Sequence, residues 1–150
     1  MRILLFAAAL SAAACSRAVP DIARTVFDAK LGVDLSQMRE LSNGVYVRDV
    51  TVGTGDEVTQ PGQVVTFFYT AYLPNGVLIQ SNDGQDPDKK LLGQGYLIAG
   101  LEAGFYGMKV GGSRQLVIPP SQGYGDAEDI PGVPPESIIV FNTVTLLGVQ

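Results

Sequence analysis

The side chains that could do chemistry in this 150-residue chain are few in kind, because it contains no histidine and a single cysteine. A Ser-His-Asp or Cys-His nucleophile and a histidine-bound zinc are therefore excluded, and one cysteine cannot form an internal disulfide. Any catalysis must rest on the shape of a cleft, on hydrogen bonds and on carboxylates. Ten basic against fifteen acidic residues argue against a nucleic-acid partner.

The polar segment 81–90 holds the densest group of charges, with three aspartates and two lysines. Its spacing lacks the calcium-loop pattern with a glutamate at the twelfth position. We therefore expect a solvated loop, and neither a metal nor a cofactor.

The most specific pattern is the stretch 107–120, GMKVGGSRQLVIPP, followed by Tyr124 and Gly125. Its residues predict a helix end, a tight glycine turn and a strand closed by a proline pair. Tyr124 then follows the exit of that strand.

Three further elements must position such a site. Strands are predicted over 45–52 and 65–73; in the second, every second residue is apolar or aromatic and should face the core. A helix is predicted between 97 and 108, where Leu101, Phe105 and Met108 share one face and Gly100 and Gly104 permit close backbone approach.

The last strand, from Ile139 to Leu146, changes parity along its length. Phe141 and Val144 both belong to the inward apolar set, although they are three positions apart and residues on one face of a strand are an even number of positions apart. This pattern predicts a β-bulge at Asn142-Thr143.

The 107–120 stretch with Tyr124-Gly125 resembles the signature of the FKBP family of peptidyl-prolyl cis-trans isomerases. The resemblance covers residues 41–150. It implies an α+β fold, in which a twisted antiparallel half-barrel of about five strands wraps around one short helix, with a hydrophobic cleft between them.

The resemblance also assigns the cleft residues. The catalytic positions, which supply two aromatic walls, a backbone N–H and a hydroxyl, are Tyr69, Phe141, Ile98 and Tyr124. The substrate-binding positions are Ile79, Gln80, Leu97, Leu101 and Val133, the last at the tip of a loop that overhangs the cleft. Gln80 stands where the family commonly has an aspartate, and an amide cannot carry that negative charge. Leu101 stands where a tryptophan often forms the floor.

The N-terminal residues are predicted to lie outside this domain. Residues 1–14 combine a positive start with an apolar run and are typical of a signal peptide. The run Ala12-Ala13-Ala14-Cys15 resembles the lipobox of bacterial lipoproteins, which implies acylation of Cys15; simple signal cleavage is the alternative. Residues 15–40 are expected to form a tether rather than a dimerisation arm.

Together these features predict a periplasmic isomerase, attached to the outer membrane through a lipid on Cys15. The resemblance implies that it catalyses X-Pro rotation without a covalent step, acts on proline-containing unfolded exported proteins and binds the macrolide inhibitors of the family. A binding-only chaperone and an interaction module are the alternatives.

Overall fold

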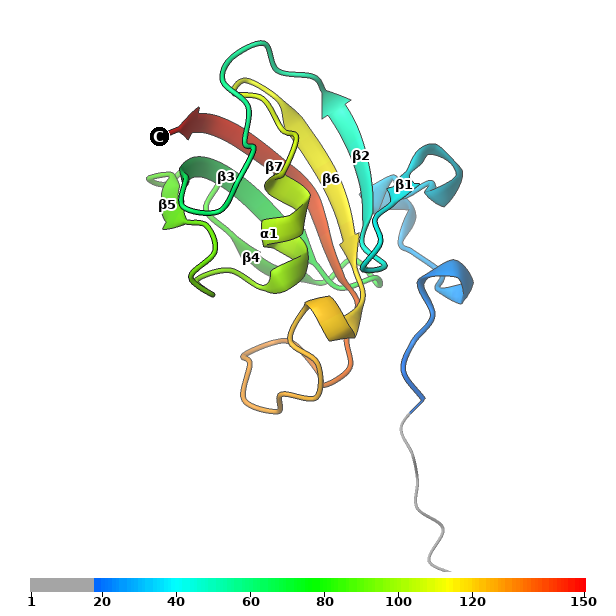
Figure 1. Ribbon diagram of the computed structural model, residues 1–150. Helices are drawn as coiled ribbons and strands as arrows, with labels where there is room; N and C mark the ends of the chain where they lie inside the picture. Colours follow the sequence, from blue (N-terminus) through cyan, green and yellow to red (C-terminus); the bar gives the residue numbers. More distant parts are fainter. Residues whose placement is uncertain (1–17) are drawn as a thin grey trace, which may run out of the picture.

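A computed structural model describes residues 18–150, and the expected signal segment and Cys15 lie outside the described residues. An antiparallel sheet curves around one α-helix, α1 (Ala99–Phe105) (Figure 1). The strands are β1 (Arg39–Glu40), β2 (Tyr46–Thr51), β3 (Val64–Tyr72), β4 (Leu78–Ser81), β5 (Asp88–Leu91), β6 (Ser113–Ile118) and β7 (Ile139–Val149). Their order is β1-β2-β6-β7-β3-β4, with β5 also paired to β3. The predicted α+β architecture is confirmed, although the sheet of the described chain has seven strands rather than about five.

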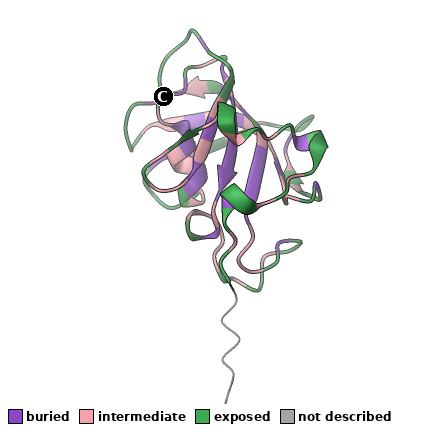
Figure 2. Ribbon diagram, turned by 90° about the vertical axis from the view of Figure 1, so that its right-hand side faces the viewer, coloured by how far each residue is buried: buried purple, intermediate pink, exposed green. Residues whose placement is uncertain are grey.

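The alternation along β3 sets the inner face of the sheet. Val65, Phe67 and Ala71 are buried there, and Phe67 stacks edge-on against Phe105 of α1 at 4.8 Å between ring centroids. The buried residues form a band through the long central strands, whereas the exposed ones lie on the loops and turns and on the outer strands β1, β2 and β4 (Figure 2). The core therefore lies between α1 and the strands, as the period-two pattern predicts.

Helix α1 packs close to β6 because glycines face that strand. A Cβ atom at Gly104 would lie 2.6 Å from Cδ1 of Leu116, which is closer than side chains tolerate. Gly100 meets Ile118 in the same way. The helix is thus held directly on the sheet, and its first residues lie at the end of the strand.

A buried arginine fixes the other end of α1. Arg114 of β6 donates to Asp49 Oδ1 at 2.6 Å, and to the backbone oxygens of Gly104 at 2.8 Å and Tyr106 at 3.1 Å. Carbonyls at a helix C-terminus lack partners within the helix, so the guanidinium satisfies them. Arg114 therefore joins β2, β6 and α1 at one point.

The predicted β-bulge in the last strand is confirmed. Thr70 of β3 pairs with Thr143, whereas its neighbour Ala71 pairs with Phe141, so Asn142 has no partner in the register. The pairing of β6 with β7 shifts at the same place. The bulge keeps Phe141 and Val144 on the inner face.

Residues 18–40 differ from the expected tether, because they pack on the outer face of the sheet. They form three short 3-10 turns, η1 (Ile22–Arg24), η2 (Ala29–Leu31) and η3 (Leu35–Gln37). Ile22 and Leu31 are buried against Val117 and Val140. Buried Gln115 donates to the Leu31 carbonyl oxygen at 2.7 Å. We call residues 18–40 the docked segment.

The segment 81–90 also differs from the expected solvated loop. Its last residues begin β5, which pairs with β3, and Asn82 is 8% exposed. Main-chain pairing with a distant strand decides this structure, and the local polar composition gives no sign of it. None of the helices within residues 18–150 is long and apolar enough to cross a bilayer.

Candidate functional site

A cleft of about 380 Å³ opens between α1 and the inner face of the sheet. This volume falls in the range of small-molecule sites. Eight of the nine residues predicted to form the cleft line it, namely Tyr69, Ile79, Gln80, Leu97, Ile98, Leu101, Tyr124 and Phe141. Among residues 18–150, no three side chains that commonly bind metals come together.

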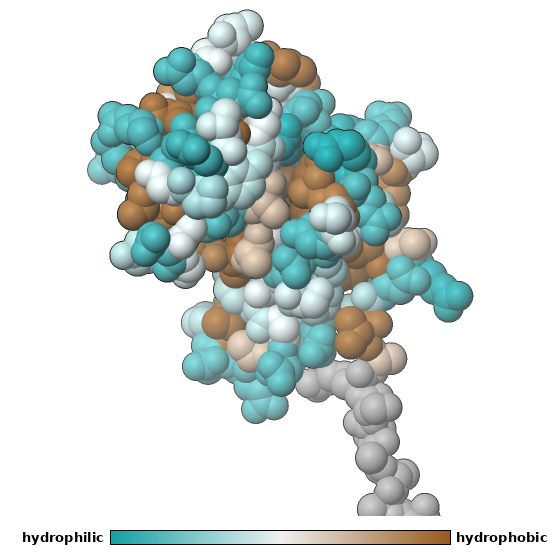
Figure 3. Space-filling model, viewed as in Figure 1, coloured by the Kyte–Doolittle hydropathy of each residue, from teal (hydrophilic) through white to brown (hydrophobic). Residues whose placement is uncertain are grey.

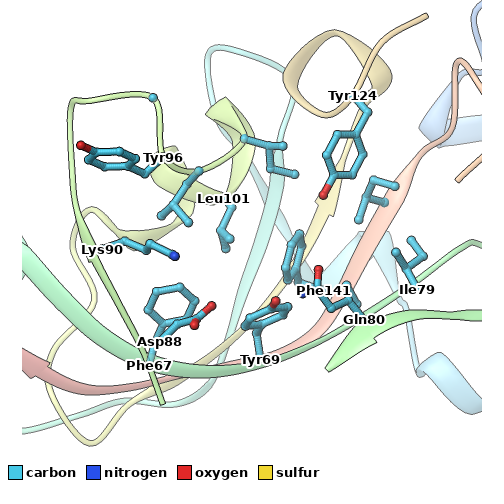
Figure 4. A pocket seen from close by; sticks show the side chains of 15 residues that line it. Phe67, Tyr69, Ile79, Gln80, Asp88, Lys90, Tyr96, Leu101, Tyr124 and Phe141 are labelled. Carbon is cyan, nitrogen blue, oxygen red and sulfur yellow. The ribbon is translucent and has the colours of Figure 1, made fainter. Parts of the chain in front are cut away.

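Aromatic rings form the sheet side of the cleft. The ring centroids of Tyr69 and Phe141, on neighbouring strands β3 and β7, lie 5.8 Å apart, and Phe67 lies 5.8 Å from Tyr69. Leu101 of α1 faces them from the other side (Figure 4). Burial raises the pKa of the Tyr69 hydroxyl, and the nearby Asp88 charge raises it further. Tyr69 is therefore a neutral hydrogen-bond donor at physiological pH.

Buried Asn82 fixes the position of the Tyr69 backbone. Its Oδ1 accepts from the Tyr69 N–H at 2.7 Å, and its Nδ2 donates to the Phe67 carbonyl oxygen at 3.2 Å. The two aromatic residues beside the cleft are thereby held in place by one amide side chain. Asn82 belongs to the segment expected to be a solvated loop, and its local sequence gives no sign of this role.

Polar groups lie opposite the aromatic rings of Tyr69 and Phe141. The Tyr124 hydroxyl points into the cleft from the chain that follows the 3-10 turn η4 (Pro120–Gln122) (Figure 4). Ile98 is the N-cap of α1; its carbonyl oxygen accepts from Leu101 N, and no described backbone oxygen accepts from its own N–H. The Tyr124 hydroxyl thus lies across the cleft from the aromatic rings, and the Tyr69 hydroxyl is a second donor on the ring side.

Val133 is the predicted site residue that does not line the cleft. It is 4% exposed and belongs to the main core, while its neighbours Pro131, Gly132 and Pro134 are exposed. Burial of a valine side chain lowers the free energy of the folded chain, whereas exposure at the tip of a glycine- and proline-rich loop does not. Val133 therefore anchors this loop in the core, and the predicted position at the exposed tip of the loop is wrong.

Three polar residues that the sequence analysis did not assign also line the cleft: Asp88, Lys90 and Tyr96. The first two come from β5, and Tyr96 precedes α1 with 66% of its surface exposed. The pairing of β5 with β3 brings Asp88 and Lys90 there, since the register joins Asp88 to Phe67 and Lys90 to Val65. On the face of Figure 3, apolar side chains reach the surface in separate places between polar ones.

The comparisons with known proteins agree with this geometry. Residues 55–147 match the family described as FKBP-type peptidyl-prolyl cis-trans isomerase. The chain is 40% identical over 110 residues to peptidyl-prolyl cis-trans isomerase FKBP15-3 of Arabidopsis thaliana, covering 72% of this chain and 76% of that protein. It is 38% identical over 104 residues to FK506-binding protein 3 of Yarrowia lipolytica, covering 69% of this chain and 25% of that protein.

A solved structure shows the same arrangement. The crystal structure of FkpA from Escherichia coli superimposes with a TM-score of 0.68 and 31% identity, covering 81% of this chain and 55% of that one. The chain spans about a quarter of the length of the first curated relatives it matches.

Proposed function

Because the chain belongs to the FKBP-type peptidyl-prolyl cis-trans isomerase family, we propose that it catalyses cis-trans rotation of X-Pro bonds in the cleft between α1 and the sheet. The observation that carries this proposal is the placement of Tyr69, Phe141 and Leu101 around one cavity, with the Tyr124 hydroxyl opposite. These groups can hold a proline ring and the carbonyl beside it.

The mechanism follows from the electronic structure of the amide. Rotation about an X-Pro bond has a barrier of about 20 kcal/mol, because the twisted transition state loses amide resonance. Water stabilises the planar amide, which is the more dipolar form. A cleft that replaces water with apolar walls therefore favours the twisted form relative to the planar one.

Each wall has a separate task in this mechanism. The rings of Tyr69 and Phe141, with Leu101, hold the proline ring so that rotation occurs on its N-terminal side. The Ile98 N–H and the Tyr124 hydroxyl donate to the carbonyls that flank the bond and orient them. No covalent intermediate and no proton transfer is needed.

An isomerisation assay on the full chain tests the proposal. We expect a protease-free assay on a short Leu-Pro peptide to show catalysis above the spontaneous rate, and FK506 to compete with the peptide, as the name of the Yarrowia relative suggests. Binding of the peptide without turnover would contradict the proposal and favour a binding-only chaperone. Absence of both binding and turnover would leave an interaction module.

We further propose that the clients are unfolded exported proteins and that the chain is held at the outer membrane of a bacterial envelope. The support is the apolar run of residues 1–14 followed directly by Cys15. Unfolded chains start with mixed proline isomers and refold slowly without catalysis, so an isomerase is useful where proteins arrive unfolded.

Cys15→Ser tests this location. If a lipid on Cys15 is the anchor, the variant should move from the membrane fraction to the soluble fraction, because acyl chains provide the membrane affinity. Ser16→Ala is the matched control and should remain in the membrane fraction. Wild-type protein that is already fully soluble would contradict acylation while leaving the isomerase proposal intact.

A further inference from the structure

One end of the cleft carries two full charges of opposite sign. Asp88 and Lys90 are two residues apart on β5, so their side chains lie on the same face of the strand, and both line the cleft. Both residues are half-buried, whereas Lys89 between them is exposed. Figure 4 shows both charged groups inside the cleft, on the side away from Ile79.

Neither charged group has an ion-pair partner within residues 18–150. The salt bridges in this part of the chain join Arg24 to Asp21, Lys109 to Glu57 and Arg114 to Asp49. A half-buried charge has lost part of its hydration, and a counter-charge brought by a ligand restores the lost stabilisation. A cleft that held only a proline ring would gain more from apolar residues at these two positions.

The two charges differ in how firmly they are placed. The Asp88 carboxylate is one methylene from the backbone, beside Phe67 in the register, so it must remain at the cleft wall. Its field reaches Tyr69 and contributes, after burial, to the raised pKa of that hydroxyl. Lys90 has a four-carbon stem and can move its ammonium group into water. This end of the cleft therefore favours a cation, as does the net charge of −5.

We propose that Asp88 makes the cleft select client segments that carry a basic side chain next to the proline, while Lys90 weakens this selection. The inference rests on the proposed isomerase function and deepens it by naming a class of substrate. Asp88 is then a specificity-determining residue, and the chemistry of rotation remains with the aromatic walls.

Two peptide series measure this selection. One series varies the residue before the proline among Lys, Leu and Glu, and the other varies the residue after it. We expect kcat/KM for the Lys peptide to exceed that for the Leu peptide about three- to tenfold in at least one series, with the Glu peptide lowest. The ratio should fall as salt is added, because screening weakens the ion pair.

Variants separate the two charges. Asp88→Asn should bring the Lys-to-Leu ratio close to one, whereas Lys90→Gln should raise it, because a repelling charge is removed. Asp86→Asn and Lys89→Gln are matched controls, since both residues are exposed and outside the cleft lining, and they should leave the ratio unchanged.

A ratio near one in both series, or a ratio that Asp88→Asn does not change, would overturn the inference while the Leu peptide is still isomerised. If no peptide is isomerised, the proposed function fails instead. In that case the dissociation constants of the Lys and Leu peptides, measured by titration, test the charge selection alone: a tighter Lys peptide supports it and equal values overturn it.

Discussion

Replacing Phe141 with alanine is expected to lower kcat/KM for a short X-Pro peptide by about 10- to 100-fold, at about 1.4 kcal/mol for each factor of ten. The Phe141 ring forms the aromatic wall of the cleft together with the Tyr69 ring, and the two ring centroids lie 5.8 Å apart. Its loss removes contact with the proline ring and admits water to the cleft, which favours the planar amide. Protease-free kinetics, referred to the folded fraction, measure the effect.

Phe105→Ala is the matched control, because it makes the same change at a buried position outside the cleft lining. It should lower stability by about 3 to 5 kcal/mol but leave kcat/KM per folded molecule near the wild-type value. Tyr124→Phe removes one neutral hydrogen bond worth about 1 kcal/mol, so its loss of kcat/KM should lie between the losses of the Phe105 and Phe141 variants. If Phe141→Ala does not fold, Phe141→Leu gives a smaller loss of the same sign. Equal activities of the Phe141 and Phe105 variants would refute the role of Phe141.

Replacing Arg114 with methionine is expected to lower the free energy of unfolding by about 3 kcal/mol, near the lower end of the range for breaking a buried pair. Arg114 is 4% exposed and donates to a carboxylate and to two carbonyls at the end of α1. Methionine keeps the apolar length but leaves these acceptors without a donor. The Asp49 side chain is 44% exposed and can be solvated in part, so a larger loss is not expected.

Urea unfolding at fixed pH measures this loss, with Lys109→Met as the control. Lys109 pairs with Glu57 at 3.9 Å, and both side chains are nearly half exposed, so the control should lose less than about 1 kcal/mol. Similar losses in the two variants would show that the buried guanidinium contributes no more to the free energy of unfolding than an exposed ion pair does. Arg114 also fixes the end of α1. We therefore expect Arg114→Met to weaken peptide binding at urea concentrations below those that unfold the sheet.

The parts of the fold that the sequence predicts are those where one local pattern dominates. The alternation along β3 places Phe67 and Tyr69 on the inner face because a strand has a strict period of two. The parity change around Asn142 predicts the bulge for the same reason. The spacing of Leu101 and Phe105 predicts a helix that covers the sheet.

The parts of the fold that the sequence does not predict depend on contacts between distant residues. Asp88 and Lys90 are polar and read locally as a loop, yet main-chain pairing with β3 makes them a strand that lines the cleft. The placement of Val133 came from a family pattern, whereas burial in this chain is decided by the rest of its loop. Neither outcome follows from local periodicity.

The docked segment had a signal that could have been used. Each of its three 3-10 turns begins after an aspartate whose side chain accepts from the backbone two residues later, at Asp21, Asp28 and Asp34. Three such caps in fourteen residues indicate defined turns along the segment. What remains unpredictable is that the apolar side chains of this segment meet the outer face of the sheet, because the strand residues that they contact are distant in the sequence. Buried Ile22 and Leu31 pack around Val117 and Val140, together with partly buried Phe27, Val33, Leu35 and Met38.

Docking of residues 18–40 sets how far the folded part can move from any attachment at Cys15. Between Cys15 and buried Ile22 there are seven residue steps, which span at most about 25 Å when fully extended. A free spacer up to residue 41 would reach about 90 Å. If Cys15 carries the lipid that we propose, this shorter span would keep the cleft in a thin layer next to the membrane. The cleft would then meet a chain emerging at that surface at a higher effective concentration than a chain diffusing beyond it.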